Sequence, residues 1–246
     1  MSISSLSGFS GAFDAPAEAD AKASPKRQTR ETAMLIQNRL EASVGAIVAD
    51  NALHARWLNT FSYLEYVGFR KIVKSQRAEV LTSEILTHAL EEGRHALGLK
   101  KLALKIGGAE FETYAPQNML CGDEAEAYFQ NLDAACDAAF ADRPDAERAK
   151  LVYCYVTWLV ERRALQVYGV YKTALGASPV AGRISGLLME EEKHLSDVES
   201  ELNAHDANFA ARAPEFEAIE AKLYETFIDA LVAELAQPKT LAAASA

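Results

Sequence analysis

The sequence predicts an all-α protein, and three observations support this prediction. Alanine, which is the strongest helix former and a weak strand former, occupies 45 of the 246 positions. Apolar residues recur at helical spacing in long segments between only seven prolines. We find no convincing run of alternating polar and apolar residues, so we expect no strands.

The predicted helices begin with a segment at about 29–76, which has an expected break near 49–51. A second helix begins near Thr82 and ends at Gly107–Gly108, because glycine favours helix C-termini. Proline fits the first turn of a helix but breaks its interior, so we expect prolines to open the later helices. Residues 109–143 are predicted to form a loop and a short amphipathic helix at about 123–140. Three further helices are predicted, from Pro144 to Gly176, from Pro179 to about Asn203, and from Pro214 onward.

These elements predict one helical domain, 28–236, between two mobile tails. Residues 1–27 are rich in Ser, Ala and Gly and show no helical periodicity, and 237–246 are interpreted in the same way. The chain length and the 50% hydrophobic content suffice for a sizeable core.

The composition excludes several classes of partner. The formal net charge is −10 and the pI is near 5.1, which argues against nucleic acid or an anionic membrane. The three cysteines form no CxxC pair and are interpreted as reduced thiols. No apolar stretch approaches the ~20 residues that span a bilayer, and we see no secretory signal. We therefore expect a cytoplasmic protein.

Two glutamates interrupt otherwise apolar helix faces. Glu65 is the sole charge in FSYLEYVGF, and Glu161 ends the apolar stretch in YCYVTWLVERR. A lone ionised carboxylate on a buried face is costly unless it is paired, protonated or bound to a metal. Both residues are therefore candidates for a buried site.

Each of these glutamates is followed, 27 or 30 residues later, by a Glu and a His three residues apart. Residues i and i+3 share a helix face, so each pair can offer one oxygen and one nitrogen to an ion. The two motifs, LEEGRH and MEEEKH, have the same residue order and indicate an internal repeat of two helical hairpins. Packed with approximate two-fold symmetry, the hairpins would assemble the ligand set of a dinuclear metal site: Glu65, Glu92, His95, Glu161, Glu191 and His194.

The alternative interpretation of these motifs is a set of solvated Glu–His pairs beside satisfied buried glutamates. In either case the adjacent Glu91, Glu190 and Glu192 are expected to point away from the shared face into solvent.

In motif order and architecture, residues 50–203 resemble the ferritin-like di-iron carboxylate superfamily. The resemblance implies a four-helix bundle with a long crossover, 109–143, that makes helices two and three parallel, plus accessory helices. It implies two iron ions, or manganese with iron, bridged by Glu92 and Glu191. Each ion would also take one motif histidine and one terminal carboxylate, Glu65 or Glu161.

Several departures distinguish the chain from well-known members of this superfamily. It lacks the four-cysteine site of full-length rubrerythrins, and Ala164 stands where the rubrerythrin pattern has an additional Glu. His95 and Glu161 are 66 positions apart, and this separation exceeds the shorter insertion of ferritins. The chain therefore resembles the di-iron oxidases and oxygenases more closely.

The resemblance implies an oxidoreductase that activates dioxygen to oxidise an apolar small-molecule substrate. Its electrons would come from an external donor, because no flavin, haem or iron–sulfur motif is visible, and we expect a homodimer. Two alternatives stay open: a ferroxidase, iron-handling or peroxide-reducing ferritin-like protein, and a non-catalytic helical scaffold.

Two further residues lie on the stripes that carry the predicted ligands. His88 precedes Glu92 by one turn, and the matching position of the other motif is Leu187. We expect His88 to support the ligands, with ligation itself as the alternative. Tyr168 follows Glu161 by seven residues, and its possible roles are a hydrogen-bond donor, a radical relay or a core aromatic. The same three roles are open for Tyr63 and Tyr66, which flank Glu65. His54 and His205 are expected to lie far from the site.

Overall fold

The computed structural model describes residues 25–75, 78–79 and 81–237. The predicted tails, 1–27 and 237–246, lie almost entirely outside these residues. The described residues form seven α-helices and two short 3-10 helices and no strand, which confirms the all-α prediction. The elements are α1 (Pro25–Val48), α2 (Asn51–Ser75), α3 (Ser83–Gly107), η1 (Ala109–Glu112), η2 (Pro116–Asn118), α4 (Gly122–Ala139), α5 (Asp145–Leu175), α6 (Pro179–His205) and α7 (Phe209–Leu235).

Local capping explains several of the helix boundaries. The predicted break near 49–51 separates α1 from α2, and there Asp50 accepts two backbone N–H groups at the start of α2, at 2.9 and 3.1 Å. The Thr82 hydroxyl caps α3 in the same way. Helix α3 ends at Gly107, and Gly108 adopts a φ of 97°, a conformation that favours glycine.

The prediction that Pro214 opens the last helix is wrong, because α7 begins at Phe209 and contains Pro214. Asp206 anchors this earlier start: its carboxylate accepts the backbone N–H of Asn208 and contacts the Arg212 guanidinium at 2.9 Å. A proline in the second turn removes only one intrahelical hydrogen bond. An anchored first turn can tolerate that loss.

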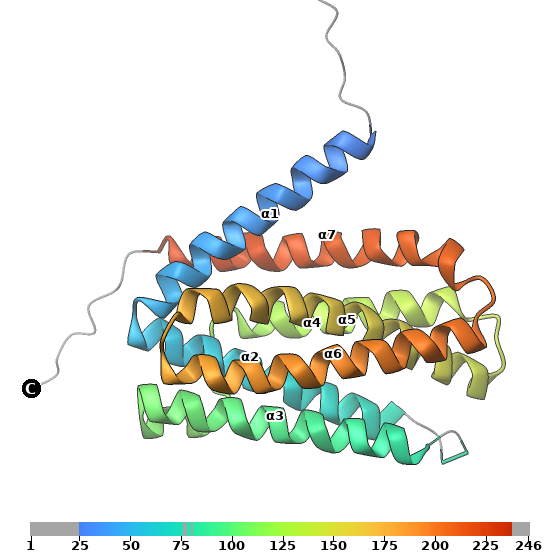
Figure 1. The fold of residues 1–246 in the computed structure, drawn as a ribbon, viewed down its shortest axis with the longest axis horizontal. Helices are drawn as coiled ribbons and strands as arrows, with labels where there is room; N and C mark the ends of the chain where they lie inside the picture. The colour runs from blue at the N-terminus through green and yellow to red at the C-terminus, as the bar shows by residue number, and fades with distance from the viewer. Residues whose placement is uncertain (1–24, 76–77, 80, 238–246) are drawn as a thin grey trace, which may run out of the picture.

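Figure 1 shows two antiparallel helix pairs, α2 with α3 and α5 with α6, that lie side by side. Between the pairs, η1, η2 and α4 form the connection, and α4 runs back along the length of the molecule. Helices α3 and α5 therefore run in the same direction, as the crossover prediction requires. Helix α7 packs against α4 and α1, and the N-terminal part of α1 projects beyond the other helices.

Buried polar side chains of α2 hold the crossover in place. The Asn59 amide donates to the carbonyl oxygens of Thr113 and Asn118 at 3.1 and 2.9 Å. The Thr60 hydroxyl accepts the N–H of Leu120 at 2.8 Å and donates to its carbonyl oxygen at 3.0 Å. These bonds satisfy polar groups that would otherwise be buried without partners.

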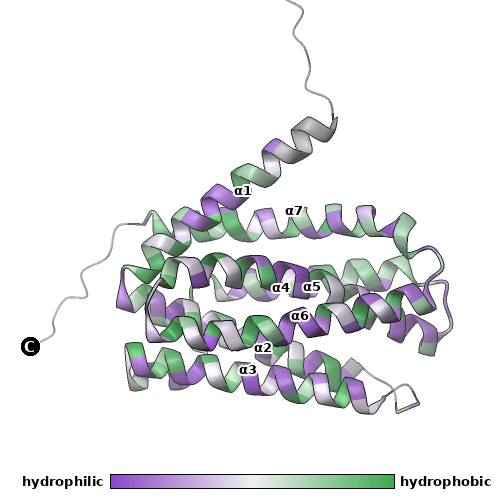
Figure 2. Cartoon of the chain, in the orientation of Figure 1, coloured by the Kyte–Doolittle hydropathy of each residue, from purple (hydrophilic) through white to green (hydrophobic). Residues whose placement is uncertain are grey.

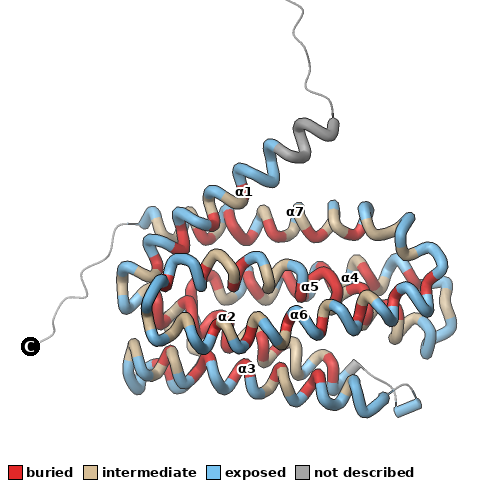
Figure 3. Tube along the Cα trace, viewed as in Figure 1, coloured by how far each residue is buried: buried red, intermediate tan, exposed pale blue. Residues whose placement is uncertain are grey.

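One apolar core extends through the helices. Hydrophobic residues alternate with hydrophilic ones around each helix, and the buried residues face the neighbouring helices (Figures 2 and 3). The largest fully buried side chains are Trp57, Tyr155, Tyr171 and Phe140. Across the described part of the chain, no helix combines the length and apolar character that a bilayer crossing requires.

The close approach of α3, η1 and α2 generates a stability prediction. A Cβ atom at Gly107 would lie 2.1 Å from the Phe111 ring and 2.7 Å from the Ala55 side chain. We expect Gly107→Ala to destabilise the protein by about 1–3 kcal/mol through overpacking. The matched control is Gly98→Ala in the same helix, where a Cβ meets nothing within 4 Å.

Gly98→Ala should be neutral or stabilising by up to about 1 kcal/mol, because alanine is the better helix former. Urea unfolding of both variants measures the difference. Equal stability of the two variants would show that α3, η1 and α2 do not pack this closely.

Candidate metal centre

The structure brings all six predicted ligands together between the two helix pairs. Together with His88, they form two groups, within each of which the possible ligand atoms lie within 4.8 Å of one another. Helix α2 supplies Glu65, α3 and α6 each supply a Glu and a His, and α5 supplies Glu161. The first group is Glu65, Glu92, His95 and Glu191, and the second is His88, Glu92, Glu161 and His194.

Two glutamates connect the groups. Glu92 belongs to both of them. The two oxygens of Glu191 face different histidines: Oε1 lies 3.0 Å from His95 Nδ1, and Oε2 lies 3.1 Å from His194 Nδ1. These are the two residues to which the family resemblance assigns a bridging role.

The expectation that Glu91 and Glu190 are merely solvated is wrong. Glu91 on α3 contacts Nε2 of His194 at 2.8 Å, and Glu190 on α6 contacts Nε2 of His95 at 2.7 Å. Each motif thus holds the histidine of the other motif through its first glutamate. Both histidines are left with Nδ1 directed at the cluster, and such carboxylate contacts fix the ring orientation of metal-ligating histidines. Glu192 is exposed, as predicted.

Arg94 supports this arrangement at the surface, with its guanidinium 2.6 Å from Glu190 and 3.7 Å from Glu91. Reasoning about one helix at a time missed these contacts, because the partner of each glutamate lies on a different helix. The doubled glutamate in both LEEGRH and MEEEKH was the available signal.

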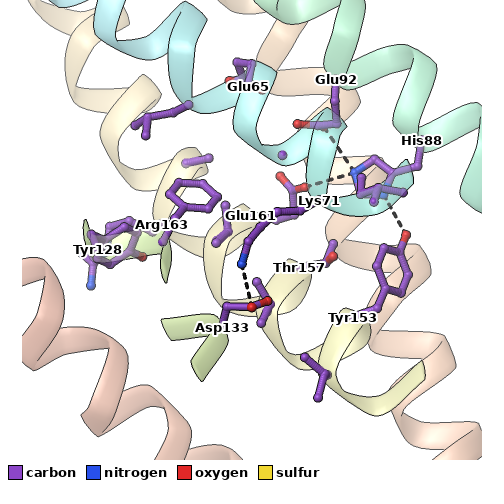
Figure 4. Close-up of a pocket in the computed structure, with 18 of the residues that line it drawn as sticks. Glu65, Lys71, His88, Glu92, Tyr128, Asp133, Tyr153, Thr157, Glu161 and Arg163 are labelled. Carbon is purple, nitrogen blue, oxygen red and sulfur yellow. Dashed lines mark hydrogen bonds and ion pairs between the residues drawn. The ribbon is translucent and has the colours of Figure 1, made fainter. Parts of the chain in front are cut away.

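Some of the tyrosine and histidine candidates contact the cluster, and the others pack elsewhere. The Tyr168 hydroxyl donates a hydrogen bond to Glu65, and the Tyr153 hydroxyl lies 2.8 Å from Nδ1 of His88 (Figure 4). The remaining candidates have other partners: Tyr63 bonds Glu126, Tyr66 stacks on Tyr114, His54 bonds Tyr171, and His205 is half-exposed near Glu201.

The donor set fits metal ions. Four buried atoms of the cluster lack a hydrogen-bond partner, namely His88 Nε2, Glu92 Oε1, His95 Nδ1 and Glu191 Oε1. Buried polar atoms rarely stay unsatisfied in native proteins without a ligand or a special role. Carboxylate oxygens combined with imidazole suit iron or manganese.

Burial and mutual repulsion perturb the pKa values of the carboxyl groups without metal. Burial, followed by the charge of Glu65, raises the pKa of Glu92 to about 8. Burial, followed by Glu191 and Glu92, raises the pKa of Glu161 well above its ordinary value. Burial alone would raise the pKa of Glu191, but the adjacent His194 and His95 rings outweigh this effect and lower the pKa of that carboxyl.

Burial lowers the pKa of a histidine, which is opposite to its effect on a carboxyl group. Burial alone would lower the pKa of His95, but the carboxylates of Glu191 and Glu65 raise it to about 12. The pKa of His194 is also raised, because Glu191 and Glu91 outweigh the effect of burial. The metal-free site therefore retains protons at neutral pH that an incoming cation must displace.

A cavity of about 480 Å³ adjoins the cluster between α2, α4, α5 and α7 (Figure 4). The lining positions on α5 extend from Asp145 to Tyr168, which is about 35 Å of α-helix. Most of the wall is apolar, including Phe61, Leu64, Val156, Val160, Ala164 and Phe227.

The charged side chains in the cavity wall have partners other than a ligand. Lys71 lies 2.8 Å from Asp133, and Arg163 lies 2.7 Å from Glu220. Gly68 lets α2 approach the site closely, because a Cβ at this position would lie 3.1 Å from Glu92 Oε2. Apart from the cluster itself, the cavity is therefore suited to apolar molecules.

Comparisons with protein families, curated proteins and solved structures gave no match to this chain.

The pKa shifts predict opposite pH dependences for the metal-free and metal-loaded protein. Glu92 and His95 bind protons more tightly in the folded than in the unfolded chain, so metal-free stability should fall as pH rises from 6 to 8. Metal displaces these protons, so it should bind more tightly at pH 8. We expect Mn²⁺ to raise the melting temperature more at pH 8 than at pH 6. An equal or smaller shift at pH 8, measured by calorimetry, would contradict this assignment of protons.

Proposed function

We propose that the chain is a dinuclear metal oxidoreductase of the ferritin-like di-iron carboxylate type. Its cofactor would be two iron ions, or manganese with iron, held by Glu65, Glu92, His95, Glu161, Glu191 and His194. The two antiparallel helix pairs with parallel α3 and α5 support the ferritin-like arrangement. Four carboxylates and two imidazoles from four helices support a dinuclear centre.

When bound, the two ions would supply the redox chemistry, with dioxygen as oxidant and an organic molecule as substrate. Insertion of one oxygen atom into a C–H bond consumes two electrons and two protons and releases the other oxygen atom as water. The electrons would come from an external donor.

The residues of the chain hold this chemistry in a fixed geometry. Glu91 and Glu190 keep Nδ1 of both motif histidines directed at the cluster. Tyr168 holds its proton, because burial and the charge of Glu65 raise its pKa well above the ordinary value. It can therefore remain a hydrogen-bond donor to Glu65 and fix that carboxylate.

The observation that carries the oxidase proposal is the apolar cavity beside the cluster. A chamber of about 480 Å³ is in the size range of small-molecule sites. Its apolar wall can exclude water from the reacting region and hold an apolar substrate beside the metals. Iron storage requires no such chamber for an organic molecule.

We also propose that the protein forms a homodimer. Large apolar side chains are exposed on α3 and α6, with Leu90 at 70% and Met189 at 72% exposure. Burial of such side chains against a second copy of the chain would favour association. Sedimentation of the purified protein measures its mass, and a monomer at micromolar concentration would contradict this part of the proposal.

Iron loading tests the proposal against its two alternatives. Metal-free protein is given ferrous iron without oxygen and is then exposed to oxygen. We expect two irons per chain to bind and to be oxidised. Iron that accumulates far beyond two per chain in a large assembly would instead establish storage. The absence of any affinity for ferrous iron would establish a scaffold.

Glu92→Ala should abolish the binding of two metal ions, because Glu92 belongs to both ligand groups. The metal-free variant should be at least as stable as the metal-free wild type, since it loses a buried carboxyl that repels its neighbours. Melting curves with and without two equivalents of metal separate the effects. If iron or manganese does not stabilise the wild type, the cluster is not a metal site.

Ala164→Phe should fill the cavity without removing a ligand, because Ala164 lines it one turn after Glu161. We expect unchanged metal content and at least tenfold weaker binding of the neutral apolar dye N-phenyl-1-naphthylamine, followed by fluorescence. The control is Ala138→Phe at an exposed position of α4. Equal dye binding by both variants would show that the cavity does not take apolar ligands.

A further inference from the structure

We propose that His88 is a seventh metal ligand and that it makes the two metal positions unequal. The inference rests on the proposed metal centre and deepens it. Four observations support it: the direction of one ring nitrogen, the group that holds the other nitrogen, the broken symmetry of the repeat, and the chemistry of the resulting donor sets.

The first observation is that Nε2 of His88 points into the cluster (Figure 4). It lies 3.2 Å from Glu92 Oε1 and 3.4 Å from Glu161 Oε1. The residue is buried, and this nitrogen has no hydrogen-bond partner. A buried ring nitrogen that faces two carboxylates without a hydrogen bond is placed to share a cation with them.

The second observation is that the other ring nitrogen is held from outside. Nδ1 of His88 lies 2.8 Å from the hydroxyl of Tyr153 on α5. Glu190 and Glu91 hold the outer nitrogens of His95 and His194 in the same way. All three histidines thus share the arrangement of metal-ligating imidazoles, with one nitrogen directed at the site and the other fixed by a neighbour.

The third observation is that His88 breaks the internal repeat. The motifs match at the glutamates and the motif histidine, but the position that corresponds to His88 is Leu187, which is buried and apolar. One half of the centre therefore has two imidazoles, from His88 and His194, whereas the other half has one, from His95.

The fourth observation is the chemistry of these donor sets. Imidazole suits iron, whereas carboxylate suits manganese, and divalent iron binds a given site more tightly than divalent manganese. The position at His88, Glu161 and His194 should therefore bind iron first. The more oxygen-rich position at Glu65 and His95 should fill second and accept manganese more readily.

The test is anaerobic titration of the metal-free protein with ferrous iron, in competition with a chromogenic chelator. The wild type should bind two ions with unequal affinities. His88→Leu makes the two halves alike, so the tighter affinity should fall by at least tenfold and approach the weaker one. Tyr153→Phe keeps the imidazole but removes the group that holds it, and should weaken the tighter site about tenfold.

His205→Gln, at a half-exposed histidine remote from the cluster, is the matched control and should leave both affinities unchanged. Two unchanged affinities in both His88→Leu and Tyr153→Phe would overturn the inference and leave the dinuclear site intact. If circular dichroism shows that His88→Leu does not fold, the affinities of Tyr153→Phe alone test the inference. If the wild type binds no iron, the proposed function itself fails.

X-ray absorption at the iron edge gives an independent readout. Wild-type protein loaded with one equivalent of iron should show two imidazoles around the metal, and His88→Leu should show one. A single imidazole in the wild type would also overturn the inference.

Discussion

The burial of mutually repelling carboxylates beside imidazoles in an apolar interior is the main physical constraint on this molecule. Each isolated buried charge costs several kcal/mol even after relaxation. Without metal, raised pKa values keep protons on Glu92 and Glu161 and so reduce this cost. Metal ions can replace these protons as the compensating positive charge. The site therefore costs stability when empty and, under the proposed function, would contribute stability when filled; the melting experiments measure this linkage.

This constraint also explains why the two helix pairs depend on one another. Glu91 of α3 holds His194 of α6, and Glu190 of α6 holds His95 of α3. The Nε2 atom of each motif histidine is held by the other pair, so these two contacts form only when the pairs are docked. The crossover determines how they dock, because it returns the chain so that α3 and α5 run in the same direction.

The sequence predicted the helices and the six residues that meet in the cluster because those signals are local. A single charge in an apolar run marks Glu65, and an i, i+3 spacing marks Glu92 with His95. Contacts between helices were not predictable in this way: the roles of Glu91 and Glu190 appear only when α3 and α6 face each other. The early start of α7 likewise depends on the anchoring by Asp206, which outweighs the local preference of Pro214 for a first turn.

The position of His88 connects the inequality of the two metal positions to the surrounding space. Both His88 and Tyr153 line the apolar cavity and also a second cavity of about 570 Å³, whose wall includes Glu91, His194 and Lys193. The His88–Tyr153 pair thus lies between a mainly apolar cavity and a second cavity lined by many polar side chains. Under the proposed function, substrate would occupy the apolar side. On the other side, the partly exposed Glu91 contacts His194, which faces the cluster. The inferred nitrogen-rich position lies at this boundary, so the metal bound there would contact both environments.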